Sequence, residues 1–238
     1  APYLYKTTDY GKIWRKITNG INPEHFTRVL REDPKQKGLL YAGTETGMYI
    51  SFDNGENWKS FQLNLPIVPV TDITIKENNL IVATQGRSLW IIDDLTVIHQ
   101  LYNSEASDIK IYKPKDTYRM RGGSREGSKT NGTNHPNGVI TYFNLDNFKE
   151  TDTISITYFD TKGDTIKTFV NKQKDDKLKV KKGANKFVWN MVYKGAEKLD
   201  GMILWWASLS GPKAIPGKYK VTLNVNGDVK SQPFKILA

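Results

Sequence analysis

Residues 51–58 read SFDNGENW, and residues 7–14 read TTDYGKIW. Both octapeptides have a hydroxyl residue, Asp two positions later, Gly two positions after that, and Trp three positions further on. Asn54-Gly55 predicts a two-residue hairpin turn, because such turns need positive φ angles that Asn and Gly tolerate. An Asp just before the turn can accept backbone N–H bonds and lock it. A structural role, with no part in catalysis, is therefore assigned to Thr7, Asp9, Gly11, Trp14, Ser51, Asp53, Gly55 and Trp58.

Short strand signals fill the rest of the chain. They are rich in β-branched and aromatic residues and are separated by Gly, Asn, Asp or Pro, and no stretch of a dozen residues has a helical period. The clearest segments are LLYAG, MYISF, LIVAT, SLWII, VITYF, TISITYF, KFVWNMVY and YKVTLNV. The sequence therefore predicts an all-β protein.

The octapeptide at 51–58 belongs to an internal repeat. AGTETGMYISFD (42–53) aligns without a gap over VATQGRSLWIID (82–93), which gives a period of 40 residues. A period of about 40 to 45 residues with four short strands is typical of a β-propeller blade. In the later copy Leu95 replaces the Gly and Ile98 replaces the Trp, so a third, degenerate box is expected there.

TTDYGKIW and SFDNGENW resemble the Asp-box, or BNR (bacterial neuraminidase), repeats of sialidases, xyloglucanases and sortilin-type propellers. Other segments resemble the end of bacterial proteins of the glycosyl hydrolase, BNR-repeat type, in which an immunoglobulin-like β-sandwich follows a sortilin-like propeller. These segments are ATQGRSLWIIDDL (83–95), NHPNGVITYF (134–143), GANKFVWNM (183–191) and GPKAIPGKYKVTLNVNGDVKSQPFKI (211–236). The resemblance covers nearly the whole chain.

The resemblance implies two domains, a partial β-propeller at 1–102 and an immunoglobulin-like sandwich at 106–238. The first range supplies about two and a half blades, whereas a closed propeller has about four to eight. We therefore expect the remainder of the propeller, or a partner chain, to cover the open blade faces. Within the second range, the Gly-, Ser- and Asn-rich segment 121–138 predicts a loop.

The positive charge is concentrated in the second part of the chain. Residues 1–102 hold 11 Lys and Arg against 11 Asp and Glu, and residues 103–238 hold 24 against 14. Residues 172–182, KQKDDKLKVKK, predict a solvated polar hairpin, which we favour over attachment to an anionic glycan or nucleic acid. No stacking aromatic lies within this run, so no nucleic-acid partner is predicted.

Composition gives little direct information on the compartment. The chain has no Cys, which rules out disulfides and thiolate metal sites, and no apolar run long enough to span a bilayer. The N-terminal residues lack the pattern of a signal peptide. The resemblance implies an exported bacterial protein, periplasmic or at the cell surface, from which any signal peptide has already been removed.

No metal or cofactor site is predicted. His25, His99 and His135 are far apart in sequence and have no carboxylate at ligand spacing. Glycoside hydrolysis needs two carboxylates about 5 to 10 Å apart, for which Asp72 and the Asp93-Asp94 pair are candidates. Asp93 has a structural explanation at the box position, so no residue is assigned a catalytic role.

Two further groups of residues have a structural and a functional interpretation. Arg28, Arg31, Asp72 and Arg87 are placed where they would line a central channel and contact an acidic or polyhydroxylated ligand, or form ion pairs between blades. The adjacent Trp205 and Trp206 would point to opposite faces of a strand and either stack on a sugar or pack at a domain interface.

The predicted function is a non-catalytic binding or assembly module of an exported Asp-box propeller protein, with a glycan or protein ligand. The alternative is the C-terminal part of a sialidase-like or xyloglucanase-like glycoside hydrolase whose catalytic residues are mostly outside this chain.

Overall fold

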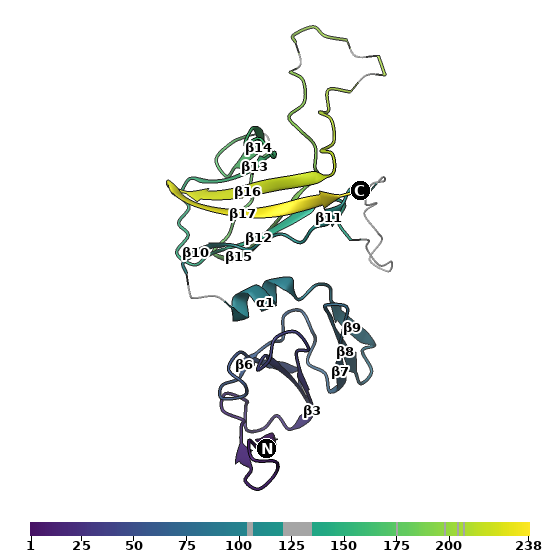
Figure 1. The fold of residues 1–238 in the computed structure, drawn as a ribbon, viewed down its shortest axis with the longest axis vertical. Helices are drawn as coiled ribbons and strands as arrows, with labels where there is room; N and C mark the ends of the chain where they lie inside the picture. The colour runs from purple at the N-terminus through teal and green to yellow at the C-terminus, as the bar shows by residue number, and fades with distance from the viewer. Residues whose placement is uncertain (104–106, 121–134, 175, 198, 204, 207) are drawn as a thin grey trace. The chain divides into compact units, whose positions relative to one another are not determined.

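The computed structural model describes residues 1–103, 107–120, 135–174, 176–197, 199–203, 205–206 and 208–238. The described chain is all-β apart from one short helix, and it divides into two compact units, Ala1–Glu105 and Ala106–Ala238 (Figure 1). Among the described residues, no helix is long and apolar enough to cross a membrane. Most of the predicted loop at 121–138 lies outside the described residues.

The first unit contains three antiparallel sheets, each with its strands in chain order. The sheets are β1-β2, β3-β4-β5-β6 and β7-β8-β9, and the helix α1 follows β9. The bounds are β1 (Tyr5–Lys6), β2 (Arg15–Lys16), β3 (Thr27–Glu32), β4 (Leu40–Thr44), β5 (Met48–Ser51), β6 (Lys59–Ser60), β7 (Val70–Lys76), β8 (Asn79–Thr84), β9 (Leu89–Ile92) and α1 (Thr96–Tyr102).

The middle sheet is covered on both faces. Every residue of β4 and β5 is buried. Because side chains alternate along a strand, Tyr41 and Ile50 belong to one apolar cluster, while Ala42 and Tyr49 belong to another. The first cluster takes in the sheet β7-β8-β9 through residues such as Leu80, and the second takes in segments beside the hairpin β1-β2. The sheets therefore pack face to face in chain order.

The sheet β7-β8-β9 is covered on one face only. Its inner face contributes Leu80 and Val82 to the cluster shared with the middle sheet. On the opposite face, Ile91 is opposite Ile81 on the neighbouring strand. Leu89 and Ile91 are 64% and 56% exposed. This unit therefore ends in an apolar sheet face that none of its described residues covers.

Strand register corrects the gapless alignment of the repeat. Tyr41 is paired with Ile50 in the middle sheet, and Ile81 is paired with Ile91 in the next. The offset is 40 residues in the first strand of each pair and 41 in the second, so the later loop has one extra residue. The residue equivalent to Asp53 is thus Asp94 and not Asp93.

The expected third box is replaced by α1. Leu95 is fully buried, and Ile98 and Tyr102 pack against the cluster formed by the two larger sheets. This i, i+3, i+7 spacing is helical, but it is too short to stand out in the sequence. The Asn54-Gly55 prediction also needs correction, since seven residues (52–58) connect β5 and β6.

The second unit has two sheets that share one apolar core. Their strand orders are β10-β12-β15 and β11-β17-β16-β13-β14, with β11 parallel to β17 and the other pairs antiparallel. The core includes Trp189 stacked on Tyr158, with 4.5 Å between the ring centroids. The bounds are β10 (Ile109–Ile111), β11 (Thr117–Tyr118), β12 (Val139–Leu145), β13 (Ile154–Phe159), β14 (Thr165–Val170), β15 (Gly183–Trp189), β16 (Gly217–Val225) and β17 (Asp228–Leu237).

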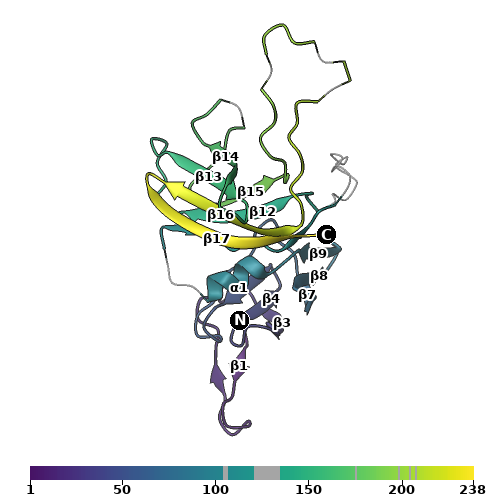
Figure 2. The same cartoon turned by 45° about the horizontal axis from the view of Figure 1, so that its top comes forward.

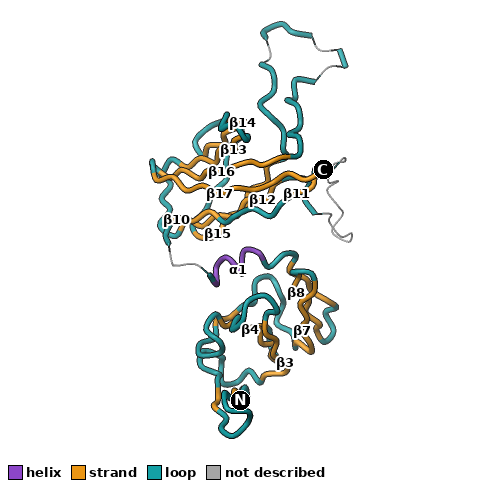
Figure 3. Tube along the Cα trace, viewed as in Figure 1, coloured by secondary structure: helices purple, strands orange, loops and turns teal. Residues whose placement is uncertain are grey.

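Two connections in this unit differ from expectation. The predicted hairpin at 172–182 is an irregular connection, because β14 pairs with β13 and not with β15. Between β15 and β16 the described residues form no strand, and this long connection runs away from both sheets in Figures 2 and 3. Trp205 and Trp206 lie on it, 84% and 96% exposed, so they do not occupy opposite faces of a strand.

Candidate functional site

The two octapeptides, 7–14 (the first box) and 51–58 (the second box), form turns with the same hydrogen bonds. In the second box, Asp53 Oδ1 accepts from the Ser51 hydroxyl at 2.8 Å and from the backbone N–H of Asn57 at 2.8 Å. Ser51 Oγ in turn accepts from the Gly55 N–H at 2.9 Å. A single hydroxyl–carboxylate pair therefore holds donors from both halves of the turn.

The first box repeats these contacts. Asp9 Oδ1 accepts from the Thr7 hydroxyl at 2.7 Å and from the Ile13 N–H at 3.0 Å. Thr7 Oγ1 accepts from the Gly11 N–H at 2.9 Å. The backbone is alike as well, because Tyr10 and Gly11 have φ angles of 57° and 89°, and Asn54 and Gly55 have 60° and 88°. The positive φ expected from the Asn-Gly pair is thus present, although the turn is longer than a two-residue hairpin.

These hydrogen bonds keep both carboxyl groups ionised. The N–H of Ile13, followed by the Thr7 hydroxyl, lowers the pKa of Asp9. Burial raises the pKa of Asp53, but the hydrogen bonds from Asn57 and Ser51 outweigh it and leave the pKa below its ordinary value. A general acid needs the opposite shift, so the geometry suits turn locking and not proton donation.

The tryptophans of the two boxes have different surroundings. Trp58 is 3% exposed, and its Nε1 donates to the backbone oxygen of Ile17 at 2.8 Å. It therefore reaches back to the preceding hairpin. Trp14 is 58% exposed and donates to Gly11 O of its own turn at 3.1 Å. The same sequence position is thus an inter-sheet anchor in one box and an uncovered side chain in the other.

Arg31 and Asp72 are brought together, from β3 and β7. Arg31 Nη2 lies 2.7 Å from Asp72 Oδ1, and both side chains are about half exposed. The same oxygen accepts from the Ile73 N–H at 2.8 Å. An exposed pair of this kind contributes about 0.2 to 1 kcal/mol. It links neighbouring sheets, as the ion-pair interpretation anticipates.

The other two residues of the predicted set, Arg28 and Arg87, have contacts of their own. Arg28 forms an ion pair with Glu45, and its guanidinium lies over the Phe26 ring at 5.3 Å from the centroid. Arg87 is exposed on the loop between β8 and β9, where its backbone oxygen accepts from Trp90 Nε1. Of these four residues, Arg31 and Asp72 are joined by an ion pair, and Arg28 is paired with Glu45.

A buried polar network that sequence reasoning missed connects α1 to the middle sheet. The Asp33 side chain is fully buried, and its Oδ2 lies 2.8 Å from His99 Nε2. Its Oδ1 accepts from the N–H groups of Lys35 and Gln36. Burial and the neighbouring Asp33 carboxylate raise the pKa of Tyr41. The network closes a turn and anchors a helix. Asp33 and His99 are 66 positions apart in the sequence, so no local sequence pattern indicates that they are in contact.

Of the candidate acids for glycoside hydrolysis, Asp94 is hydrogen-bonded and Asp93 is exposed to solvent. Asp94 Oδ1 accepts from Asn78 Nδ2 and from the Thr96 N–H, which places it at the start of α1. Asp93 is exposed. Among the described residues, no group of three or more His, Cys, Asp and Glu side chains is placed to hold a metal ion.

No protein-family model matches the chain, and comparison with the curated proteins finds no match. The functional assignment therefore rests on geometry and on the resemblance described above.

Proposed function

We propose that this chain is a non-catalytic binding or assembly module. In this proposal residues 1–102 are part of an Asp-box β-propeller and residues 106–238 form an immunoglobulin-like sandwich. The parent protein is exported to the periplasm or cell surface and binds a glycan or protein ligand.

One observation carries the proposal: three sheets packed face to face with apolar side chains uncovered at both ends. Trp58 is covered by the preceding hairpin, whereas the equivalent Trp14 has no such cover. At the other end Leu89 and Ile91 are exposed. Repeat architectures bury such faces by stacking one unit on the next. Further sheets, from the same polypeptide or a partner, would complete the arrangement.

Strand order in the second unit supports the immunoglobulin-like part. An immunoglobulin fold divides its strands between a sheet containing A, B and E and a sheet containing G, F and C. The orders β10-β12-β15 and β11-β17-β16-β13-β14 fit this division, with the last two strands, β16 and β17, side by side in the larger sheet. The buried Trp189 gives the core a large aromatic centre.

The state of the carboxyl groups favours a binding role over the hydrolase alternative. Asp9, Asp53 and Asp152 have pKa values shifted clearly from the ordinary value, and each is lowered by hydrogen bonds. A glycosidase acid needs a raised pKa beside a second carboxylate. Asp72, one of the candidate acids, forms an ion pair with Arg31 instead.

Turnover assays test the choice between the two functions. The purified chain is offered a panel of polysaccharides and sialosides, and release of reducing sugar or sialic acid is measured. We expect no release above the buffer control. Turnover that disappears in Asp72→Asn or Asp94→Asn, while Asp53→Asn retains it, would overturn the proposal and establish a hydrolase.

A further inference from the structure

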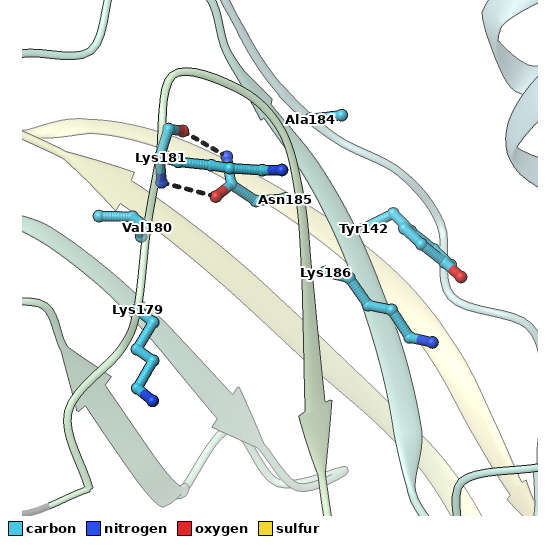
Figure 4. A pocket seen from close by; sticks show the side chains of 7 residues that line it. All are labelled: Tyr142, Lys179, Val180, Lys181, Ala184, Asn185 and Lys186. Atoms are coloured by element: carbon cyan, nitrogen blue, oxygen red, sulfur yellow. Dashed lines mark hydrogen bonds between the residues drawn. The ribbon is translucent and has the colours of Figure 1, made fainter. Parts of the chain in front are cut away.

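A groove of about 430 Å³ lies on the second unit, beside the start of β15. Lys179 and Lys181 border it from the segment that precedes β15, and Tyr142 and Lys186 border it from β12 and β15 (Figure 4). Tyr142 and Lys186 are opposite each other on neighbouring strands, and Lys186 Nζ lies 5.9 Å from the centre of the tyrosine ring.

Asn185 holds the rim of the groove in shape. This side chain is 7% exposed. Its Oδ1 accepts from the Lys181 N–H at 2.8 Å, and its Nδ2 donates to the Lys181 backbone oxygen at 2.7 Å (Figure 4). The same Nδ2 also donates to the Gly183 backbone oxygen at 2.8 Å. Because one buried amide makes all three bonds, the tight turn between Lys181 and Asn185 is locked. The backbone that carries Lys181 is thereby fixed next to the strand that carries Lys186.

The residues that line the groove carry positive charges and no negative charge that would balance them. Its lining contains lysines but no carboxylate. Residues 177–196 include six lysines and no Asp or Glu. Within the described parts of the chain, no ion pair joins Lys179, Lys181 or Lys186 to an acidic side chain, whereas Lys167 is paired with Asp176. A concave site lined by one sign of charge focuses the potential and attracts counter-ions.

We propose that this groove binds an anionic polysaccharide, through carboxylate or sulfate groups. Its charges are lysine ammonium groups, which act as compact point charges, and its lining has no arginine fork of the kind that recognises phosphate bidentately. Single-stranded nucleic acid also needs free aromatic faces for base stacking. The lining offers one aromatic ring, Tyr142, and Lys186 lies over it.

A binding assay with matched lysine variants tests this site. Sodium alginate supplies carboxylates, heparin supplies sulfates, and dextran supplies an uncharged chain; each is immobilised, and binding of the full chain is measured at low and at high salt. The test variant is Lys181→Gln/Lys186→Gln. The control variant, Lys218→Gln/Lys235→Gln, removes the same charge from two exposed residues paired across β16 and β17.

The wild-type chain is expected to bind alginate, heparin or both, more weakly as salt increases, and not to bind dextran. The test variant should lose about tenfold in affinity, equivalent to about 1.4 kcal/mol, and the control about twofold or less. The preferred polymer identifies the anionic group. Equal losses in both variants, no binding to either anionic polymer, or tighter binding to single-stranded DNA would each overturn the proposal. Circular dichroism verifies that both variants are folded.

Discussion

Replacing Trp58 by Ala should remove a large part of the stability of the first unit. The side chain is 3% exposed, and its Nε1 bonds to Ile17 O at 2.8 Å. Truncating a buried Trp to Ala costs about 3 to 5 kcal/mol, to which the unpaired Ile17 oxygen adds about 1 kcal/mol. We therefore expect a loss of about 4 to 6 kcal/mol, against a total of about 5 to 15 kcal/mol for a typical domain. The Trp58→Phe variant keeps an apolar ring and should lose less free energy of unfolding than Trp58→Ala.

Trp14→Ala is the matched control, because Trp14 occupies the same box position. It is 58% exposed and bonds only within its own turn. A substitution at such a site should cost about 1 kcal/mol or less. Urea unfolding followed by far-UV circular dichroism measures both variants without relying on tryptophan fluorescence. Similar losses for the two variants would refute the claim that Trp58 anchors one sheet to the previous hairpin.

Three further predictions concern the turn and the buried network. The pKa of Asp53 is lower in the folded than in the unfolded chain, so the contribution of its carboxylate to folding stability is present above about pH 4 and is lost as the pH falls. The difference in free energy of unfolding between wild type and Asp53→Asn, measured in urea titrations, should therefore become smaller between about pH 7 and about pH 3. A constant difference would contradict this. Gly55→Ala should destabilise the protein by at least about 1 kcal/mol more than Gly86→Ala, as measured by thermal unfolding. Both glycines have positive φ, but an added Cβ at Gly55 would lie 2.6 Å from Ile17 Cδ1, whereas at Gly86 it would meet nothing within 4 Å. Equal destabilisation by the two substitutions would show that the contact with Ile17 is unimportant. His99→Leu should lower the free energy of unfolding by about 2 kcal/mol or more, because it leaves the buried Asp33 carboxylate without its histidine partner. Backbone amides of α1 should then exchange their hydrogens faster. Unchanged exchange would argue that His99 does not anchor the helix.

The strands were predictable because short runs of β-branched and aromatic residues between turn residues favour strands. LLYAG and MYISF, both predicted as strands, correspond to β4 and β5, in which every residue is buried. The box turns were predictable too, since Asp and Gly at fixed spacing satisfy local backbone donors. Both features depend on neighbours within a few residues, where sequence patterns are informative.

Features set by distant contacts were not predictable. The helix α1 is only seven residues long, and its amphipathic spacing becomes meaningful only once the sheet cluster is known. The extra residue in the later repeat is visible only from strand pairing. The groove combines Tyr142 with residues about 40 positions later, so its lysines read as an ordinary solvated run.

Light scattering of the purified chain tests the central claim most directly. If the three-sheet stack has uncovered ends, burying several hundred Å² of apolar surface at about 25 cal/mol per Å² should drive association. We expect wild type to form oligomers or aggregates, and Leu89→Lys/Ile91→Lys to associate less while its circular dichroism is unchanged. The matched control, Thr165→Lys/Ser231→Lys, adds the same charge at two exposed residues of the second unit and should behave like wild type. A stable 27.1 kDa wild-type monomer, with the same behaviour in both variants, would contradict the account.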